Sequence, residues 1–210
     1  MKRSSLVIID YGMGNIASVL NAVEFISNEK CDITSSPEEL KNYKGVILPG
    51  VGAFGKAMQN IKKAGLDKAI KEFIERDGFF LGICLGYQLL FEESEESPSV
   101  KGLGILKGKV VKFKDKNLKI PHIGWNNVTW EKDPPILKGI SKGSFFYFVH
   151  SYYPVFKIPG SITLFTEYSN TKFASGLIYK KISAVQFHPE KSQKNGLILL
   201  KNFWRMCRDV

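Results

Sequence analysis

Cysteine and histidine are both scarce in this chain, with three of each in 210 residues. The cysteines, Cys31, Cys84 and Cys207, are odd in number and show no paired spacing. This pattern argues against a disulfide framework and favours the reducing cytoplasm. No cysteine or histidine pair has the spacing of zinc ligands, so we expect no metal site.

Long apolar runs are also missing, because no stretch approaches the ~20 residues that a membrane-spanning helix needs. The basic start followed by Leu6–Ile9 is similar to a signal peptide, but the run is short and Asp10 ends it. It predicts a first buried strand instead. The 44% hydrophobic content is ample for the core of one domain spanning residues 1–210.

The net charge of +10 raises the possibility of a nucleic-acid surface. The lysines are scattered along the chain, however, and no RNA-recognition or helix-turn-helix motif is present. The acidic run 92–96 also interrupts the positive charge. We therefore expect neither a nucleic acid nor a membrane as a partner.

Strands and helices alternate through the first half of the sequence. Short apolar runs predict strands, and longer amphipathic segments predict helices. The expected strands are Leu6–Ile9, Cys31–Thr34, Val46–Leu48 and Phe79–Ile83, and the expected helices are Asn15–Ser27, Phe54–Lys62, Leu66–Arg76 and Leu85–Glu92. This alternation predicts an α/β fold with an open, mostly parallel sheet flanked by helices.

The second half is richer in strands, which we expect to add antiparallel strands to that sheet. They are Lys109–Phe113, Asn126–Trp130, Phe145–Tyr152, Ile162–Glu167, Ala174–Tyr179 and Ile182–Phe187, followed by a helix over Lys194–Cys207. No repeat, low-complexity tract or linker divides the chain, which supports a single domain.

Cys84 stands where a buried strand turns sharply into a helix. Such an elbow crowds the positions two before and two after its apex, and both are glycine, Gly82 and Gly86. The start of the following helix favours a thiolate, through its free N–H groups and its dipole. A buried core cysteine is the alternative, but the flanking glycines favour a nucleophile.

A nucleophilic cysteine needs a base, and His188 is the candidate at the end of a predicted strand. The proline that follows it biases His188 toward extended geometry. Glu190 can accept a hydrogen bond from the far imidazole nitrogen, which is the orienting role in a triad. Taken alone, the tripeptide 188–190 (HPE) could equally form an ordinary surface turn.

Several segments together identify a family. They are 10–15 (DYGMGN), 48–54 (LPGVGAF), 82–96 (GICLGYQLLFEESEE), 121–126 (PHIGWN), 147–152 (YFVHSY) and 186–192 (QFHPEKS). Because it contains these segments, the chain resembles the class I (triad) glutamine amidotransferases, most closely the glutaminase subunits of imidazole glycerol phosphate synthase. The resemblance implies a flavodoxin-like fold and a Cys84-His188-Glu190 triad that needs no cofactor. Tyr87 departs from the methionine that is usual in similar sequences.

An oxyanion formed on attack by Cys84 needs backbone N–H donors that are fixed in advance. We expect these donors from Leu85 and from the Gly50–Gly52 turn, with Gly52 as first choice and Val51 as its neighbour. Glycines on both sides of Val51 allow the peptide to rotate. The alternative is an ordinary strand-to-helix turn. Similarity to the family implies that this turn is switchable and forms the hole once the partner is loaded.

The resemblance also implies roles for residues that bind glutamine or a partner. Gln88, Glu96, Ser151 and Tyr152 are expected to bind glutamine, although Glu96 belongs to a charged run that normally faces solvent. Trp125, Asn126, Tyr147 and Lys191 match positions at the ammonia exit, where a plain surface is the alternative. We expect His122 and His150 to have structural or interface roles.

The partner implied is a separate (β/α)8-barrel cyclase in a heterodimer, since such a barrel takes ~250 residues. Ammonia released from glutamine would pass to that cyclase in histidine biosynthesis. Two alternatives remain open: a paralogous glutaminase that supplies a surface-sugar amidating synthase, and an inactive regulatory or structural subunit.

Overall fold

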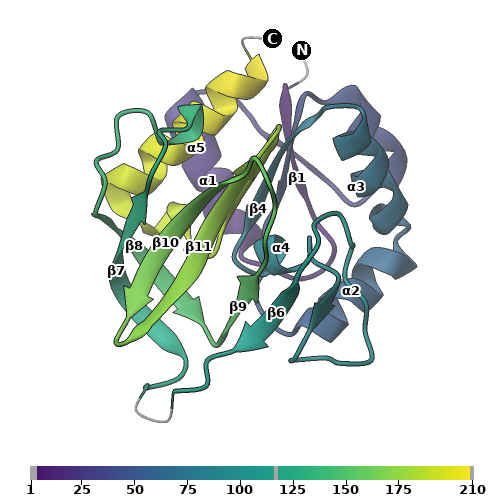
Figure 1. Cartoon of the computed structure of the whole chain (residues 1–210). Helices are drawn as coiled ribbons and strands as arrows, with labels where there is room; N and C mark the ends of the chain where they lie inside the picture. The colour runs from purple at the N-terminus through teal and green to yellow at the C-terminus, as the bar shows by residue number, and fades with distance from the viewer. Residues whose placement is uncertain (1–3, 116–117, 209–210) are drawn as a thin grey trace.

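A nine-stranded mixed sheet runs through the centre of the protein in the computed structural model, which describes residues 4–115 and 118–208 (Figure 1). Its strands are β1 (Leu6–Ile9), β2 (Asp32–Thr34), β3 (Gly45–Leu48), β4 (Phe79–Ile83), β7 (His122–Trp130), β8 (Ser144–His150), β10 (Ile162–Tyr168), β11 (Thr171–Tyr179) and β12 (Ile182–Val185). Their order is β2-β1-β3-β4-β12-β11-β10-β7-β8. The pairs from β2 to β12 are parallel, and those from β12 to β8 are antiparallel. The predicted α/β class is thus confirmed.

A second, three-stranded sheet lies beside the main one and has the order β5-β6-β9. Its strands are β5 (Glu93–Ser94), β6 (Lys109–Lys112) and β9 (Tyr152–Val155). The helices are α1 (Ile16–Ser27), α2 (Phe54–Lys63), α3 (Leu66–Glu75), α4 (Leu85–Gln88) and α5 (Gln193–Arg208), with 3-10 turns η1 (Pro37–Asn42), η2 (Pro135–Leu137) and η3 (Pro189–Lys191).

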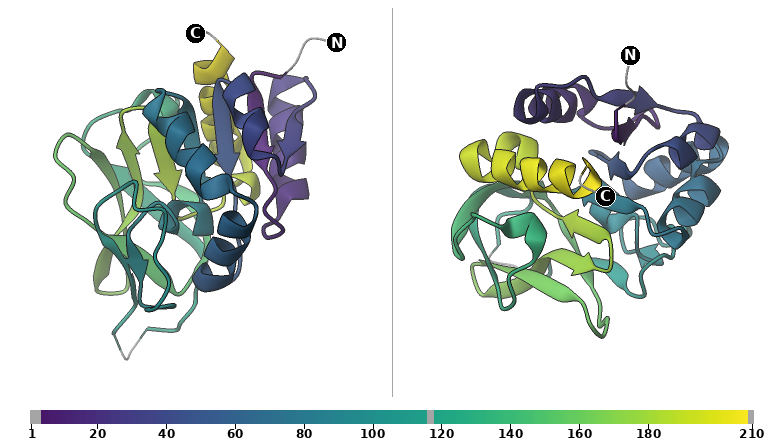
Figure 2. Two further views of the ribbon diagram at one scale, coloured as in Figure 1. Left: turned by 90° about the vertical axis from the view of Figure 1, so that its right-hand side faces the viewer. Right: turned by 90° about the horizontal axis from the view of Figure 1, so that it is seen from above.

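Helices cover both faces of the parallel half of the sheet (Figures 1 and 2). Side chains alternate along a strand, so β1 supplies Leu6 and Ile8 to one core and Val7 and Ile9 to the other. The first core also contains residues of α1 and α5, and the second contains residues of α2 and α3. Both faces are therefore buried, as a parallel sheet requires.

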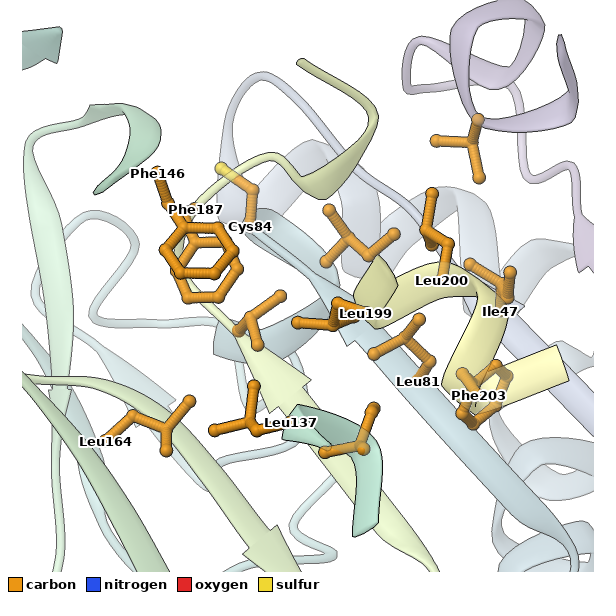
Figure 3. Close-up of a cluster of buried hydrophobic side chains, with 14 of the residues drawn as sticks. Ile47, Leu81, Cys84, Leu137, Phe146, Leu164, Phe187, Leu199, Leu200 and Phe203 are labelled. Carbon is orange, nitrogen blue, oxygen red and sulfur yellow. The ribbon is translucent and has the colours of Figure 1, made fainter. Parts of the chain in front are cut away.

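The first core extends to the sulfur of Cys84 (Figure 3). Phe146 of β8 stacks on Phe187, with 4.1 Å between ring centroids. Both side chains are fully buried. This packing anchors the backbone just before His188, because Phe187 immediately precedes the histidine.

Most predicted elements agree with the structure to within a few residues, but three predictions were wrong. The helix expected over Leu85–Glu92 ends at Gln88, and two short turns follow. The strand expected over Phe145–Tyr152 is two strands in different sheets, separated at Ser151. The strand expected from Asn126 begins at His122. In each case the bounds of the element depend on contacts with distant segments. The local residue pattern does not encode these contacts.

Tyr87 packs in the second core rather than in a binding pocket. It is completely buried, makes an edge contact with Phe91 at 5.5 Å, and its hydroxyl has no partner among the described residues. Burial raises the pKa of this hydroxyl well above its usual value.

Replacing Tyr87 by phenylalanine should therefore stabilise the protein. Removing a buried, unpaired hydroxyl is expected to raise the free energy of unfolding by about 1–3 kcal/mol. Urea unfolding of the variant and the parent measures this difference. A less stable variant would mean that the hydroxyl has a partner after all.

Candidate active site

A pocket of about 350 Å³ opens at the carboxyl ends of β3 and β4. Ligands in open α/β sheets bind at this edge. The pocket is lined by Val51, Gly52, Cys84, Leu85, Gln88, Glu96, Pro121, Val149, His150, Ser151 and Tyr152. Eight of the predicted site residues thus line one cavity: Val51, Gly52, Cys84, Leu85, Gln88, Glu96, Ser151 and Tyr152.

The backbone of Cys84 is strained, with φ 53° and ψ −105°. Non-glycine residues rarely adopt positive φ, and such strain collects at functional sites. A Cβ on Gly82 would lie 2.8 Å from the Gly86 carbonyl oxygen, and one on Gly86 would overlap the Leu48 carbonyl oxygen. The crowding predicted around the elbow is therefore present, and it holds the sulfur at the apex.

The N–H of Leu85, the first residue of α4, donates to the carbonyl of Gly50 at 3.3 Å. The Leu85 N–H is one of the donors predicted for an oxyanion hole. In this structure it is already used in the hydrogen bond to the Gly50 carbonyl. Gly52, the other expected donor, has φ 103°, a conformation that favours glycine. Val51 is 37% exposed at the pocket mouth.

His188 and Glu190 form a buried pair next to the elbow. His188 Nδ1 and Glu190 Oε1 are 2.8 Å apart, and both side chains are almost completely buried. The 3-10 turn η3, which begins at Pro189, brings the carboxylate back toward the imidazole. The other ring nitrogen, Nε2, is buried with no hydrogen-bond partner among the described residues.

The charge of the imidazole depends on opposing effects. Burial disfavours the imidazolium, but the Cys84 thiolate and Glu190 favour it more strongly, and the pKa of His188 rises to about 10. Cys84 acts by its charge, and Glu190 acts by its charge and by the hydrogen bond that it accepts from Nδ1. His188 is therefore placed to hold a proton as a base does beside a cysteine nucleophile.

Gln186 reaches the nucleophile as well, and the sequence analysis assigned it no role. Its Nε2 donates to Cys84 Sγ at 3.6 Å, and its Oε1 accepts from Gln88 Nε2 at 3.1 Å. The sequence signal was an uncharged polar residue at the end of an apolar strand, two positions before His188. That signal alone does not say which neighbour the amide contacts.

The residues expected to bind substrate already make contacts inside the protein. Glu96 accepts the N–H of Phe54, the first residue of α2, through Oε2 at 2.7 Å. Gln88 Nε2 and His150 Nδ1 each lie 2.9 Å from the carbonyl oxygen of Tyr152. Ser151 lines the pocket, and its carbonyl accepts the N–H of Phe113.

The predicted interface residues lie on β7, β8 and η3, outside the pocket. Trp125 is 45% exposed and contacts its strand neighbour Tyr147, with ring centroids 6.1 Å apart. Lys191 is exposed. Asn126 donates to the Glu167 carbonyl at 2.9 Å.

Two backbone hydrogen bonds join this surface to the triad. The N–H of His188 donates to the Tyr147 carbonyl at 2.9 Å, and the N–H of Tyr147 donates to Ser192 Oγ at 3.0 Å. The Ser192 hydroxyl in turn donates to the His188 carbonyl at 2.6 Å. A displacement of β8 would therefore move the backbone of His188.

His122 and His150 form a buried pair at the pocket wall, where His150 lines the cavity and His122 lies next to it. His122 Nδ1 and His150 Nε2 are 3.0 Å apart, and the His122 ring stacks between Phe148 and Tyr168. Burial lowers the pKa of His122 to about 4 and that of His150 to about 3. Both imidazoles are therefore neutral at pH 7.

This pair predicts a loss of stability in mild acid. The unfolded histidines bind protons below pH ~6.5, whereas the folded ones do not until pH 4 or lower. The free energy of unfolding should therefore fall by about 2–5 kcal/mol between pH 7 and pH 4.5. Urea unfolding at the two pH values measures this change. His122→Phe, which keeps the aromatic stack, should show a smaller fall; an equal fall would assign the acid sensitivity to other groups.

Comparison with known proteins agrees with this geometry. The family model for glutamine amidotransferase class-I matches residues 7–206. Solved structures with TM-scores of 0.71 include a glutamine amidotransferase, which is 18% identical and matched over 97% of this chain and 99% of that one. Another is PurLQS from Thermotoga maritima, with 18% identity over 100% and 99% of the two chains. At this identity they establish the fold alone. The chain belongs to the class I glutamine amidotransferases.

Curated relatives define the family more narrowly. An imidazole glycerol phosphate synthase subunit HisH from Pyrococcus furiosus is 50% identical, matched over 96% of this chain and 98% of its own. The HisH subunits of Methanocaldococcus jannaschii and Aquifex aeolicus are 50% and 46% identical, over 93% and 97% of this chain and 96% and 98% of their own. Within its class, the chain belongs to the HisH subunits of imidazole glycerol phosphate synthase.

No cluster of three or more histidine, cysteine, aspartate or glutamate side chains suited to a metal ion occurs within residues 4–115 and 118–208. In the same part of the chain, no helix has the length and apolar character needed to cross a membrane.

Proposed function

We propose that the pocket at Cys84 hydrolyses glutamine to glutamate and ammonia, which this glutaminase subunit supplies to imidazole glycerol phosphate synthesis. The observation that carries the proposal is the strained Cys84 elbow facing the buried His188–Glu190 pair. Family membership and relatives named as imidazole glycerol phosphate synthase subunits support it.

The reaction begins when His188 takes the thiol proton and the Cys84 sulfur attacks the side-chain carboxamide carbon. The carbonyl oxygen becomes an oxyanion, and His188 returns the proton to the nitrogen as the C–N bond breaks and ammonia leaves. Water, deprotonated by His188, then attacks the γ-glutamyl thioester to release glutamate and the thiolate. Glu190 holds the imidazole in one tautomer and stabilises its protonated form. These steps use protein groups and water alone.

The oxyanion is stabilised by the N–H groups of Leu85 and Gly52, with Val51 next to them. Because Leu85 N–H donates to the Gly50 carbonyl in the present structure, that carbonyl must first turn away. Rotation of the peptides between Gly50 and Gly52 does this and brings a second donor toward the pocket. We propose that the turn is the element which responds to a loaded partner.

Replacing Gly52 by proline removes its N–H and forces φ to about −65° instead of 103°. We expect glutamine hydrolysis to slow by about 10²–10³-fold, the usual effect of losing one oxyanion donor. Steady-state glutamate release measures the effect. Alkylation of Cys84 by iodoacetamide is the control, because it needs no oxyanion donor. Normal hydrolysis by the variant would exclude Gly52 as a donor.

Glutamine is bound through both of its ends. Glu96 lies at the pocket wall, and its carboxylate can pair with the α-ammonium while it holds α2. Gln88 donates both amide hydrogens within the protein, so its oxygen is the group left to contact a ligand. Ser151 and Tyr152 contribute through backbone groups, although the Tyr152 carbonyl already has two partners.

Ammonia released into water would be protonated and would escape, so an enclosed route to an acceptor site is physically sensible. We propose a (β/α)8-barrel cyclase as the partner in a heterodimer, docked where β7 and β8 expose apolar side chains beside the site. This surface comprises Ile123, Trp125, Phe145, Asn126, Tyr147 and Lys191. Trp125 and Phe145 are about half exposed, at 45% and 55%. A cytoplasmic location fits the proposal, because Cys84 must remain a free thiol.

The proposal is tested by measuring glutamate release from the purified chain, alone and with the cyclase and its nucleotide substrate. We expect slow release alone and a large increase with the loaded cyclase. Activity restricted to a sugar-amidating synthase would support the paralogous function instead. No release with either partner would support an inactive subunit.

A further inference from the structure

Gln186 lies at the junction of the two segments that form the triad. It directly follows β12, which pairs with β4, the strand that leads to Cys84. Its backbone N–H donates to the Ser175 carbonyl, and its side chain is completely buried. One short segment, 186–190, therefore supplies the base, the orienting carboxylate and this amide.

The orientation of the Gln186 amide follows from one backbone carbonyl. The Tyr152 oxygen can only accept, so the Gln88 side chain must direct its NH₂ group toward it. That same NH₂ group then faces Gln186, which must present its oxygen to Gln88. The NH₂ group of Gln186 is thereby directed at Cys84 Sγ, 3.6 Å away. Reversing either amide would place two donors or two acceptors together.

The sulfur also has a neighbour that favours the neutral thiol. Cys84 Sγ lies 3.9 Å from the Val149 carbonyl oxygen, to which a thiol can donate and a thiolate cannot. When the thiol ionises, this contact becomes unfavourable and the contact with the Gln186 amide becomes stronger, because hydrogen bonds to charged acceptors are stronger. The Gln186 amide therefore stabilises the ionised form selectively.

We propose that Gln186 is a positioning residue that holds Cys84 as a correctly aimed thiolate; the inference rests on the proposed role of Cys84 as nucleophile. His188 gives up its proton during the reaction and is then a weaker partner for sulfur. The amide of Gln186 keeps its hydrogens throughout, so it also supports the thiolate that leaves when the thioester is hydrolysed. Gln88 acts one step away, by fixing the direction of the Gln186 amide.

The test is the pH dependence of Cys84 alkylation by iodoacetamide, followed by mass spectrometry on the peptide that contains Cys84. In Gln186→Leu we expect the midpoint of the rate profile to rise by about one pH unit, with a roughly tenfold slower reaction at any pH well below the wild-type midpoint. The matched control is Thr166→Val, which removes another buried side-chain hydrogen bond, to Ser175, without contact to Cys84. An unchanged profile in Gln186→Leu, or an equal shift in Thr166→Val, would overturn the proposal.

Two further measurements keep the proposal testable if Gln186→Leu does not fold. Gln186→Glu, whose carboxylate would face the thiolate, should raise the midpoint more than leucine does. In the wild-type protein, the side-chain ¹⁵N resonance of Gln186 should titrate with the same midpoint as alkylation, and a resonance indifferent to that midpoint would refute the role. Alkylation needs no turnover, so these results are independent of whether the chain hydrolyses glutamine.

Discussion

Replacing Cys84 by alanine should reduce glutamine hydrolysis by at least about 10⁴-fold while the protein remains folded. The expected loss is large because a triad acts as a unit, and removal of its nucleophile abolishes the covalent route. Glutamate release in the presence of the loaded cyclase measures it. The small Cys84→Ala change leaves the elbow glycines and the His188–Glu190 pair in place.

Cys31→Ala is the matched control, because Cys31 lies just before β2 and outside the pocket. Burial and the nearby carboxylates of Asp32 and Glu24 raise the pKa of the Cys31 thiol to about 12, so it stays protonated at neutral pH. We expect this variant to retain full activity. Substantial glutamate release by Cys84→Ala, or its loss in Cys31→Ala, would refute the assignment of the nucleophile.

Replacing Gly86 by alanine should destabilise the fold by more than about 4 kcal/mol, which exceeds the usual effect of a single substitution. The added Cβ would overlap the backbone carbonyl oxygen of Leu48 at the end of β3. Neither side can yield easily, because β3 pairs on both sides and the elbow is fixed between β4 and α4. Urea unfolding measures the loss, and failure to fold is its extreme form.

Gly160→Ala separates this collision from the general cost of losing a glycine. Gly160 has φ 80°, and a Cβ there would meet no atom within 4 Å. We expect this control to cost only about 1 kcal/mol, the strain of a left-handed residue. If Gly86→Ala unfolded with the same midpoint as Gly160→Ala, the steric account of the elbow would be wrong.

Much of the fold was predictable because its signals are local. The strands Leu6–Ile9 and Phe79–Ile83 are short apolar runs, and the structure confirms both without change. Helix α1 begins one residue after its predicted start, because Asn15 is its N-cap and accepts the N–H of Ser18. Such signals depend on backbone geometry within a few residues.

Pairing between distant segments was the part that local pattern could not supply. The aromatic-rich segment 145–152 looks like one strand, yet β8 pairs with β7 and β9 pairs with β6. Similarly, α4 ends at Gln88 because the turns after it are held by residues far along the chain, as in the bond from Gly108 N–H to Glu92. A window of a few residues contains none of this information.

The sequence by itself determined the α/β alternation, the glycine-flanked cysteine and the histidine with its carboxylate, because residue type and short spacing encode each of them. Only the tertiary structure decided which groups meet the sulfur. The Gln186 amide is 102 residues from Cys84 along the chain, and its direction depends on the Tyr152 carbonyl on a third segment. The same holds for Leu85, whose N–H is occupied by the Gly50 carbonyl. Hydrogen-bond partners are chosen by packing in three dimensions, and no sequence spacing specifies them.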